Sequence, residues 1–159
     1  WQCGTAQVDF MLPERFDLEY VDKDGKTKKP VLIHRAPLGS LERWVGLLIE
    51  HYAGAFPVWL SPIQVIVIPI AEKHNQYAEG VVKTLKERNI RAELDDRNET
   101  TSAKIRDAEL QKIPYILVVG DREVGKKTVN VRTRGEKVLG EMSLEAFLKK
   151  ITSDIAKKE

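Results

Sequence analysis

The sequence predicts an α/β fold whose larger, second part is a mixed, mostly parallel sheet in a three-layer arrangement with helices. Residues 63–70 form a nearly unbroken β-branched run, which is typical of a parallel strand buried on both faces. An alternating segment at 90–94 and a buried apolar run at 115–119 predict two further strands, separated from the first and from each other by helical patterns. Strands that alternate with helices favour a parallel sheet with right-handed crossovers.

Composition restricts the class of protein. A length of 159 residues suits one large domain, or one small domain plus a fragment. Lys and Arg total 26 against 24 Asp and Glu, so the net charge of +2 does not by itself indicate a nucleic-acid binder. The single cysteine excludes an internal disulfide and fits a reducing compartment. The most apolar stretch, 58–71, is short and interrupted by polar residues and prolines, so no membrane span is expected.

Residues 1–57 are predicted to contain antiparallel strands and one helix. Residues 2–12 alternate partly in polarity, as a strand does, and residues 31–34 form a second strand after a turn at Gly25. One helix is thin cover for a sheet. We therefore expect the rest of this domain to lie upstream, and a start at Trp1 in place of Met indicates a fragment.

The helix of this first part is predicted to follow Ser40 and to stop at Gly54. Four apolar residues recur at the spacing of one buried helical face: Leu41, Trp44, Val45 and Leu48. Ser40 is expected to accept from an unpaired N–H of the first turn, beside which Arg43 projects. This is suitable for holding a polyphosphate, although spacing alone favours an exposed arginine on an ordinary amphipathic helix.

Residues 58–62 are predicted to be a linker, and 63–159 a second domain. Its helices are expected at 73–88, from Thr101 or Ser102 to about 112, and after a cap at Ser143. Residues 128–134 alternate as a half-exposed strand, expected to be antiparallel at a sheet edge.

Two features of the second part are candidates for binding RNA. Between Arg97 and Lys137 there are ten basic and six acidic residues, and three polar residues share one strand face: Asn130, Arg132 and Arg134. The loop at 95–99 follows a strand at the carboxyl end of the sheet, where open α/β folds bind ligands. Composition alone favours an ordinary solvated face and an Asp-rich and Asn-rich turn.

In residues 34–43, the identities of the residues are more informative about the protein family than the spacing of the apolar positions. His34-Arg-x-x-x-Gly-Ser-x-Glu-Arg43, followed by an apolar helix, resembles the third signature motif of class II aminoacyl-tRNA synthetases, and more narrowly of the threonyl-tRNA synthetase family. Residues 1–10 resemble the strand that precedes this motif, and the chain after Pro57 resembles the anticodon-binding domain. The resemblance covers the whole chain. It implies a carboxyl-terminal portion: 1–57 from the catalytic core and 63–159 as a three-layer anticodon-binding domain.

The resemblance implies roles in the first part. Arg43 would contact the adenine and terminal phosphates of ATP, which binds with Mg²⁺, while Gln2, Thr5 and Gln7 would line the adenylate pocket. His34 would be one of three ligands of a zinc ion that coordinates threonine, the upstream Cys and His being absent from this sequence. One histidine does not hold zinc tightly, so a bound metal is not expected in this chain alone. The other histidines, His51 and His74, are expected to be structural or solvent-facing.

In the second part, the resemblance places anticodon contacts at Asn98, Lys112, Glu123 and Arg132. Some family members have Arg where this chain has Lys112, and lysine lacks the planar fork for a bidentate contact. The implied activity is ATP-dependent ligation of threonine to threonine tRNA. The resemblance also implies a cytoplasmic homodimer that does not bind a membrane. These 159 residues alone are expected to bind tRNA weakly and not to form the adenylate.

Two alternatives remain open from the sequence. One is a free-standing, non-catalytic RNA-binding or accessory protein built from synthetase parts. The other is a sister synthetase for proline, histidine or glycine, which shares the anticodon-domain architecture. His34 and the Gly-Ser-x-Glu-Arg spelling argue against the sisters, whereas the sheet pattern after Pro57 does not separate them.

Overall fold

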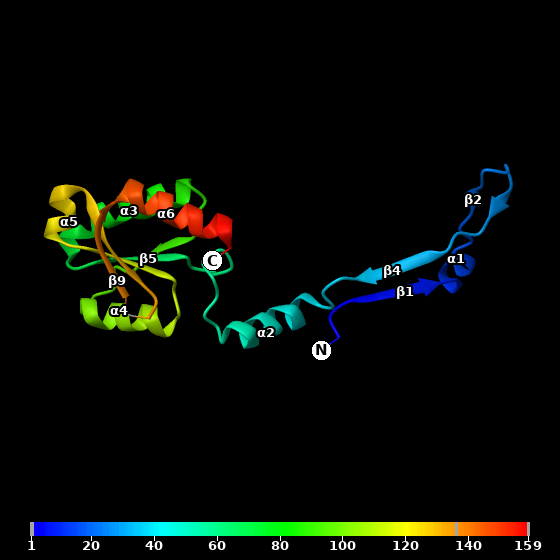
Figure 1. Cartoon of the computed structure of the whole chain (residues 1–159), viewed down its shortest axis with the longest axis horizontal. Coiled ribbons are helices and arrows are strands. Elements are labelled where there is room, and N and C mark those ends of the chain that lie inside the picture. The colour runs from blue at the N-terminus through cyan, green and yellow to red at the C-terminus, as the bar shows by residue number, and fades with distance from the viewer. Residues whose placement is uncertain (1, 136, 159) are drawn as a thin grey trace. The chain divides into compact units, whose positions relative to one another are not determined.

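The computed structural model describes residues 2–135 and 137–158, which form two compact units, Trp1–His51 and Tyr52–Glu159 (Figure 1). Trp1, where the predicted strand segment begins, and Glu159, where the predicted second domain ends, lie outside the described residues. The predicted linker at 58–62 packs within the second unit, where Val58 and Ser61 are buried. Within the described residues, no helix combines the length and the apolar character that a bilayer span requires.

The first unit contains two small antiparallel sheets. Its elements before the motif helix are β1 (Thr5–Asp9), α1 (Met11–Arg15), β2 (Tyr20–Val21), β3 (Thr27–Lys28) and β4 (Leu32–Ala36). β1 pairs with β4, and β2 with β3 around Gly25, whose φ of 74° confirms the predicted turn. The strand predicted to reach Leu12 ends at Asp9, because the Asp9 carboxylate accepts the N–H groups of Met11 and Leu12 at 2.8 and 3.0 Å and starts α1.

The motif helix α2 (Leu41–Tyr52) begins as predicted, with the Ser40 hydroxyl accepting the Arg43 N–H at 3.2 Å. The prediction of a buried face is wrong, since no residue of α2 is buried and Leu41 is 72% exposed. Helical spacing shows which side chains lie on one face. It does not supply the element that would cover them, and Val8 and Ile33 of the β1–β4 sheet are exposed as well.

The second unit is built on a five-stranded sheet of order β6-β5-β7-β8-β9 within the described residues. Its strands are β5 (Val65–Pro69), β6 (Ala92–Leu94), β7 (Tyr115–Val119), β8 (Thr128–Thr133) and β9 (Lys137–Ser143). β5 pairs in parallel with β6 and β7, and the other two pairs are antiparallel. The predicted mixed sheet is confirmed, although parallel and antiparallel strand pairs are equally numerous among the described residues, where a mostly parallel sheet was predicted. β5 and β7 are buried throughout, as predicted for strands covered on both faces.

One strand was missing from the predicted sheet. β8 is antiparallel as expected but is not at the edge, because β9 pairs with its free side. The sequence of β9, KVLGEMS, includes Gly140 in the left-handed region at φ 90°, and a bulge in its register interrupts the alternation that reveals a half-buried strand.

Helices cover both faces of this sheet, which confirms the three-layer arrangement (Figure 1). The helical elements are η1 (Glu72–His74), α3 (Asn75–Glu87), α4 (Thr101–Leu110), α5 (Asp121–Lys126) and α6 (Leu144–Lys157). α3 and α6 pack on the face that carries the larger apolar cluster, and α4 packs on the other. Ser143 caps α6 as predicted, whereas α4 is capped by Thr100, one residue before the predicted Thr101 or Ser102.

We predict that Phe147→Ala lowers the free energy of unfolding by about 3–5 kcal/mol. Phe147 is fully buried, and its ring meets that of Tyr115 edge-on with centroids 5.3 Å apart, so truncation leaves a cavity between α6 and the sheet. Urea denaturation followed by circular dichroism measures the loss. The control is Leu110→Ala at a side chain that is 70% exposed, with an expected change of no more than about 0.5 kcal/mol. Equal losses in both variants would contradict the assigned core.

Candidate nucleic-acid interface

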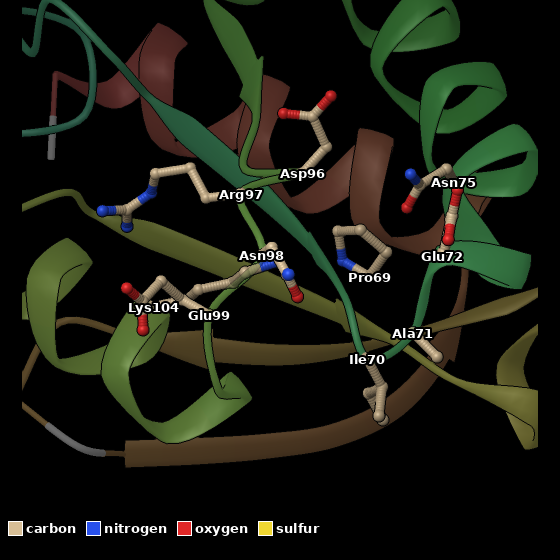
Figure 2. Close-up of a pocket in the computed structure, with 10 residues that line it drawn as sticks. All are labelled: Pro69, Ile70, Ala71, Glu72, Asn75, Asp96, Arg97, Asn98, Glu99 and Lys104. Atoms are coloured by element: carbon tan, nitrogen blue, oxygen red, sulfur yellow. The ribbon is translucent and has the colours of Figure 1, made fainter.

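A polar cavity of about 340 Å³ lies at the carboxyl ends of β5 and β6 (Figure 2). Its walls come from the loop after β5, the start of α3, the loop after β6 and the first turn of α4. Carboxylate and amide groups dominate the lining: Glu72, Asn75, Asp96, Asn98 and Glu99. Such groups accept or donate hydrogen bonds at the edges of unstacked bases. The structure therefore puts Asn98, predicted from the sequence as an anticodon contact, in a cavity of suitable chemistry.

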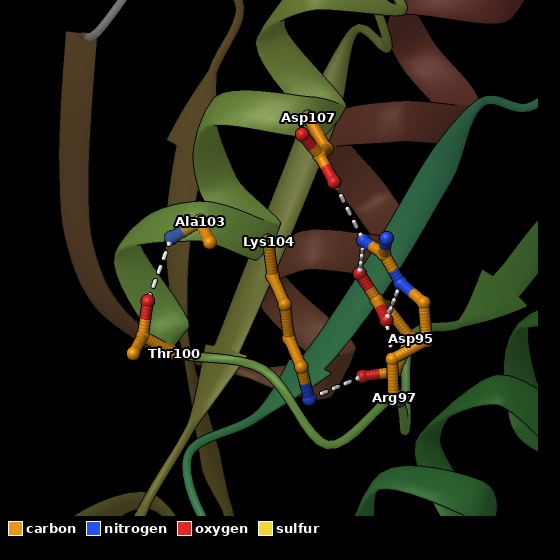
Figure 3. A network of polar contacts seen from close by, with 6 residues as sticks. All are labelled: Asp95, Arg97, Thr100, Ala103, Lys104 and Asp107. Atoms are coloured by element: carbon orange, nitrogen blue, oxygen red, sulfur yellow. Dashed lines mark hydrogen bonds and ion pairs between the residues drawn. The ribbon is translucent and has the colours of Figure 1, made fainter.

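The loop after β6 is fixed by its own charged residues (Figure 3). Asp95 is buried, and its two carboxylate oxygens accept from Nε and Nη2 of Arg97, both at 2.8 Å. The same Nη2 donates to Asp107 of α4 at 3.0 Å. The Arg97 guanidinium holds the pKa of Asp95 below its ordinary value, and the two carboxylates raise the pKa of Arg97. Sequence reasoning missed this network, because only the fold brings Asp107 beside Arg97.

A second hollow, about 670 Å³ in volume, runs between α4 and β8. It is lined by Ser102, Ile105, Arg106, Glu109, Leu110 and Arg132. Arg132 stands between Ile116 of β7 and Val138 of β9, while Val129 and Val131 are buried on the other face, which confirms the predicted alternation. The Arg132 Nε is buried and finds no hydrogen-bond acceptor among residues 2–135 and 137–158. An unmet buried donor costs about 1–3 kcal/mol, so Arg132 is held at this position at a cost, with its side chain lining the hollow.

Glu123 borders the first cavity without lining it. Its side chain is buried, and Oε2 accepts the Gly120 N–H at 2.9 Å in the first turn of α5. A Cβ on Gly120 would lie 2.6 Å from Cδ1 of Ile70, a residue of the cavity wall, so the end of this exposed side chain would have to shift. One carboxylate oxygen of Glu123 is thus occupied by the backbone. Its role as an anticodon contact remains a prediction.

Lys112 lies at the far end of α4 from Asn98. Its backbone is left-handed, with φ of 59°, and its Nζ donates to the carbonyl of Ala53. The guanidinium of Arg134 donates to the carbonyls of Phe56 and Lys112, each at 3.0 Å. Both cations therefore hold backbone of the segment before β5, a structural use that sequence reasoning did not foresee. The structure does not bring Lys112 together with Asn98, and its anticodon contact also remains a prediction.

The other predicted site residues belong to the first unit. Gln7 of β1 is directly opposite His34 of β4, and Thr5, two residues from Gln7, lies on the same face of the pair. Arg43 is in the first turn of α2, and the turn before this helix touches the start of the chain: a Cβ on Gly39 would lie 3.8 Å from the Gln2 carbonyl oxygen. Thr5, Gln7 and His34 thus share one polar surface.

His34 contacts a carboxylate through one of its two ring nitrogens. Its Nε2 lies 2.8 Å from Asp9 Oδ2, which leaves Nδ1 for another partner. A carboxylate on one ring nitrogen is common for histidines that bind metal through the other. No group of three or more His, Cys, Asp or Glu within the described residues can hold a metal ion. The His34 imidazole is compatible with the predicted role of a zinc ligand, and that role remains a prediction.

His74 was predicted to be either structural or solvent-facing, and the structure shows the first. Its side chain is almost fully buried. The Ala71 N–H donates to Nδ1 at 3.1 Å, so the proton is on Nε2, which lies 3.1 Å from Asp121 at the start of α5. The imidazole therefore ties the loop after β5 to the loop after β7.

We predict that Asp95→Asn lowers the free energy of unfolding by about 1–3 kcal/mol at pH 7, because the Arg97 pair loses its charge. The pKa of Asp95 is depressed from 3.8, so its contribution is present above this pH and is lost as the pH falls through the lower folded-state pKa. Urea unfolding of wild type and variant should show a difference that is constant near neutrality and narrows below pH 3.8. The matched control is Asp96→Asn at the exposed neighbour, for which we expect a change of no more than about 0.5 kcal/mol. A difference that does not depend on pH contradicts the ion pair.

Two family models together match most of the chain. The model of the anticodon-binding domain matches residues 64–154. The model of the class II tRNA synthetase core domain (G, H, P, S and T) matches residues 1–52. The match to the anticodon-binding domain includes the cavity, the second hollow and all four predicted anticodon residues. The match to the core domain includes the β1–β4 surface and Arg43.

Individual proteins match along the whole chain. The threonine–tRNA ligase of Aquifex aeolicus is 58% identical, over 100% of this chain and 25% of that protein. The threonine–tRNA ligase of Caldanaerobacter subterraneus is 56% identical, over 99% of this chain and 24% of that protein. The chain thus spans about a quarter of the length of the curated relatives it matches.

Solved structures agree with these matches. The RNA-binding domain of threonyl-tRNA synthetase from Cryptosporidium parvum has a TM-score of 0.82 at 40% identity, over 96% of this chain and 39% of that chain. Prolyl-tRNA synthetase of the same organism has a TM-score of 0.73 at 22% identity, over 99% of this chain and 35% of that chain, and shows the fold alone. The chain therefore belongs to the anticodon-binding domain family, and over its whole length it matches the carboxyl-terminal portion of threonyl-tRNA synthetases.

Proposed function

We propose that this chain is the tRNA-reading portion of an enzyme that uses ATP to ligate threonine to its tRNA. The observation that carries the proposal is the unmet donor of Arg132, on a sheet face beside the cavity of Asn98. The names of the relatives support threonine as the amino acid. Identity of 56–58% to threonine–tRNA ligases, against 22% to a prolyl enzyme, favours threonine over a sister synthetase.

In this proposal, unstacked anticodon bases occupy the two hollows that flank α4. The amide of Asn98 can donate and accept on one base edge, and the Arg132 guanidinium supplies donors to another base or to a phosphate. The free oxygen of Glu123 can accept from a base N–H. Lys112 keeps two of its three ammonium donors after its bond to Ala53, so it can still meet a phosphate. Local basic residues attract the RNA without specifying its sequence.

The first unit would contribute to the amino-acid and nucleotide pockets. Arg43 has a planar charged group suited to stacking on adenine and pairing with phosphates of Mg²⁺-bound ATP, and Gln2, Thr5 and Gln7 offer polar groups for the adenylate. His34 would hold zinc together with ligands from another segment, and zinc so bound would coordinate the amino and hydroxyl groups of threonine. We further propose a cytoplasmic homodimer as the working form, by extension from tRNA ligases of this family.

We predict that Arg132→Ala weakens binding of a threonine tRNA transcript by about 10- to 100-fold, since it removes charge-assisted hydrogen bonds from a half-buried position. Filter binding or fluorescence anisotropy with the 159-residue chain measures this loss. Arg88→Ala is the charge-matched control, because Arg88 is exposed at the end of α3 and lines neither hollow. Equal losses for the two variants would indicate only general electrostatic attraction and would contradict the proposed site.

A second prediction concerns catalysis by these residues alone. His34 supplies one arm of a metal site, and the chain spans about a quarter of its relatives. We expect the 159-residue chain to bind threonine tRNA but to give no threonine-dependent ATP–pyrophosphate exchange. Threonine-dependent exchange by these residues would show that they hold a complete activation site, against the proposal.

A further inference from the structure

A buried lysine at the start of α4 has no role in the function proposed above. Lys104 is 4% exposed, and its Nζ donates to the carbonyl oxygen of Asp95 at 3.0 Å (Figure 3). Its side chain extends from α4 along the wall of the cavity that contains Asn98 and Glu99. Lys104 therefore places a buried positive charge beside Asn98 and Glu99, in the wall of the candidate site.

Packing alone does not account for a lysine at this position. Burial of an ammonium costs free energy unless hydrogen bonds and opposite charges compensate for it, and an apolar residue of similar volume avoids that cost. The neighbouring inward positions of α4 are apolar, as Ala108 and Ile105 show. The gain specific to lysine is its bond to the Asp95 carbonyl, which holds backbone in the loop that carries Asn98.

The loop is held in place without using the side chains that face the cavity. Lys104 holds the Asp95 backbone, Arg97 holds the Asp95 carboxylate, and Thr100 accepts the Ala103 N–H to begin α4. Within the described residues, no hydrogen bond or ion pair is formed by the side chains of Asn98 and Glu99, which line the cavity. The ends of this loop are therefore held by other residues, while these two side chains keep their hydrogen-bonding capacity unused.

We propose that Lys104 is a positioning residue for RNA recognition, which fixes the loop after β6 so that Asn98 and Glu99 meet an unstacked base. The proposal rests on the proposed function, because it assumes that the cavity binds tRNA. Lys104 itself acts through the Asp95 carbonyl and makes no phosphate contact. Pre-ordering the loop lowers the conformational entropy lost on binding, which raises affinity without an added contact.

The test is a double-mutant cycle on the whole 159-residue chain with a threonine tRNA transcript. Lys104→Met keeps an unbranched side chain and removes the ammonium, and we expect about tenfold weaker binding with no loss of melting temperature. Asn98→Ala should weaken binding by a similar factor in wild type but have little further effect in Lys104→Met, since the loop is no longer held. Lys83→Met, at an exposed lysine on α3, is the charge-matched control and should leave affinity within about twofold.

The salt dependence of binding separates positioning from direct contact. Loss of a phosphate contact reduces the slope of log K against log salt by about one, whereas loss of a positioning residue leaves the slope unchanged. A reduced slope, additive effects of the two substitutions, or unchanged affinity in Lys104→Met overturns the inference. If Lys104→Met does not fold, Lys104→Gln is taken through the same cycle. If the unmodified chain does not bind the transcript, the proposed function itself fails.

Discussion

Parallel pairing of β5 with β6 on one side and β7 on the other is the constraint on which the second unit depends. Parallel neighbours need crossover connections. The chain crosses from β5 to β6 through α3, and then back past β5 to β7 through α4. Because these two crossovers run in opposite directions and are both right-handed, α3 and α4 lie on opposite faces of the sheet. The loops after all three strands then emerge at one edge. Glu72 and Asn98 come from the segments after β5 and β6, Glu123 comes from the first turn of α5 after β7, and His74 links the first of these segments to the third. The cavity is a consequence of this topology.

The buried charged residues near the cavity stabilise the loop after β6 and do not belong to the apolar core. Asp95 and Lys104 are both buried, and each is compensated by a partner in the loop after β6 or in α4. His74 performs a similar task through hydrogen bonds with the Ala71 N–H and the Asp121 carboxylate, which link the segments after β5 and β7. The apolar clusters on the two faces of the sheet stabilise the fold, and these polar links fix the edge of the sheet before a ligand arrives.

The sequence was sufficient for the elements with strong local signals. The β-branched runs of β5 and β7, the caps at Ser40 and Ser143, and the alternation of Val129 and Val131 against Arg132 predicted structure that was found. β9 was missed because a bulge breaks its period. α1 was missed because the Asp9 carboxylate, by accepting the N–H groups of Met11 and Leu12, favours a helical turn where the residue pattern indicates a strand. Of the candidate site, the family resemblance predicted Asn98 and Arg132, and the structure shows that each lines one of the two hollows. The Asp95–Arg97–Asp107 network and the use of Lys112 on Ala53 depend on tertiary neighbours, which no local pattern encodes.

The proposed function requires that the two hollows that flank α4 read the anticodon of threonine tRNA. The most direct measurement compares the affinity of the unmodified chain for a threonine tRNA transcript with its affinity for the same transcript carrying three replaced anticodon bases. If the hollows beside α4 read bases, each of the three replaced bases costs about 1–3 kcal/mol by analogy with base readout in duplexes, so the altered transcript binds at least about a hundredfold more weakly. Equal affinity for the two transcripts would mean that the chain holds only the RNA backbone, and would contradict the account.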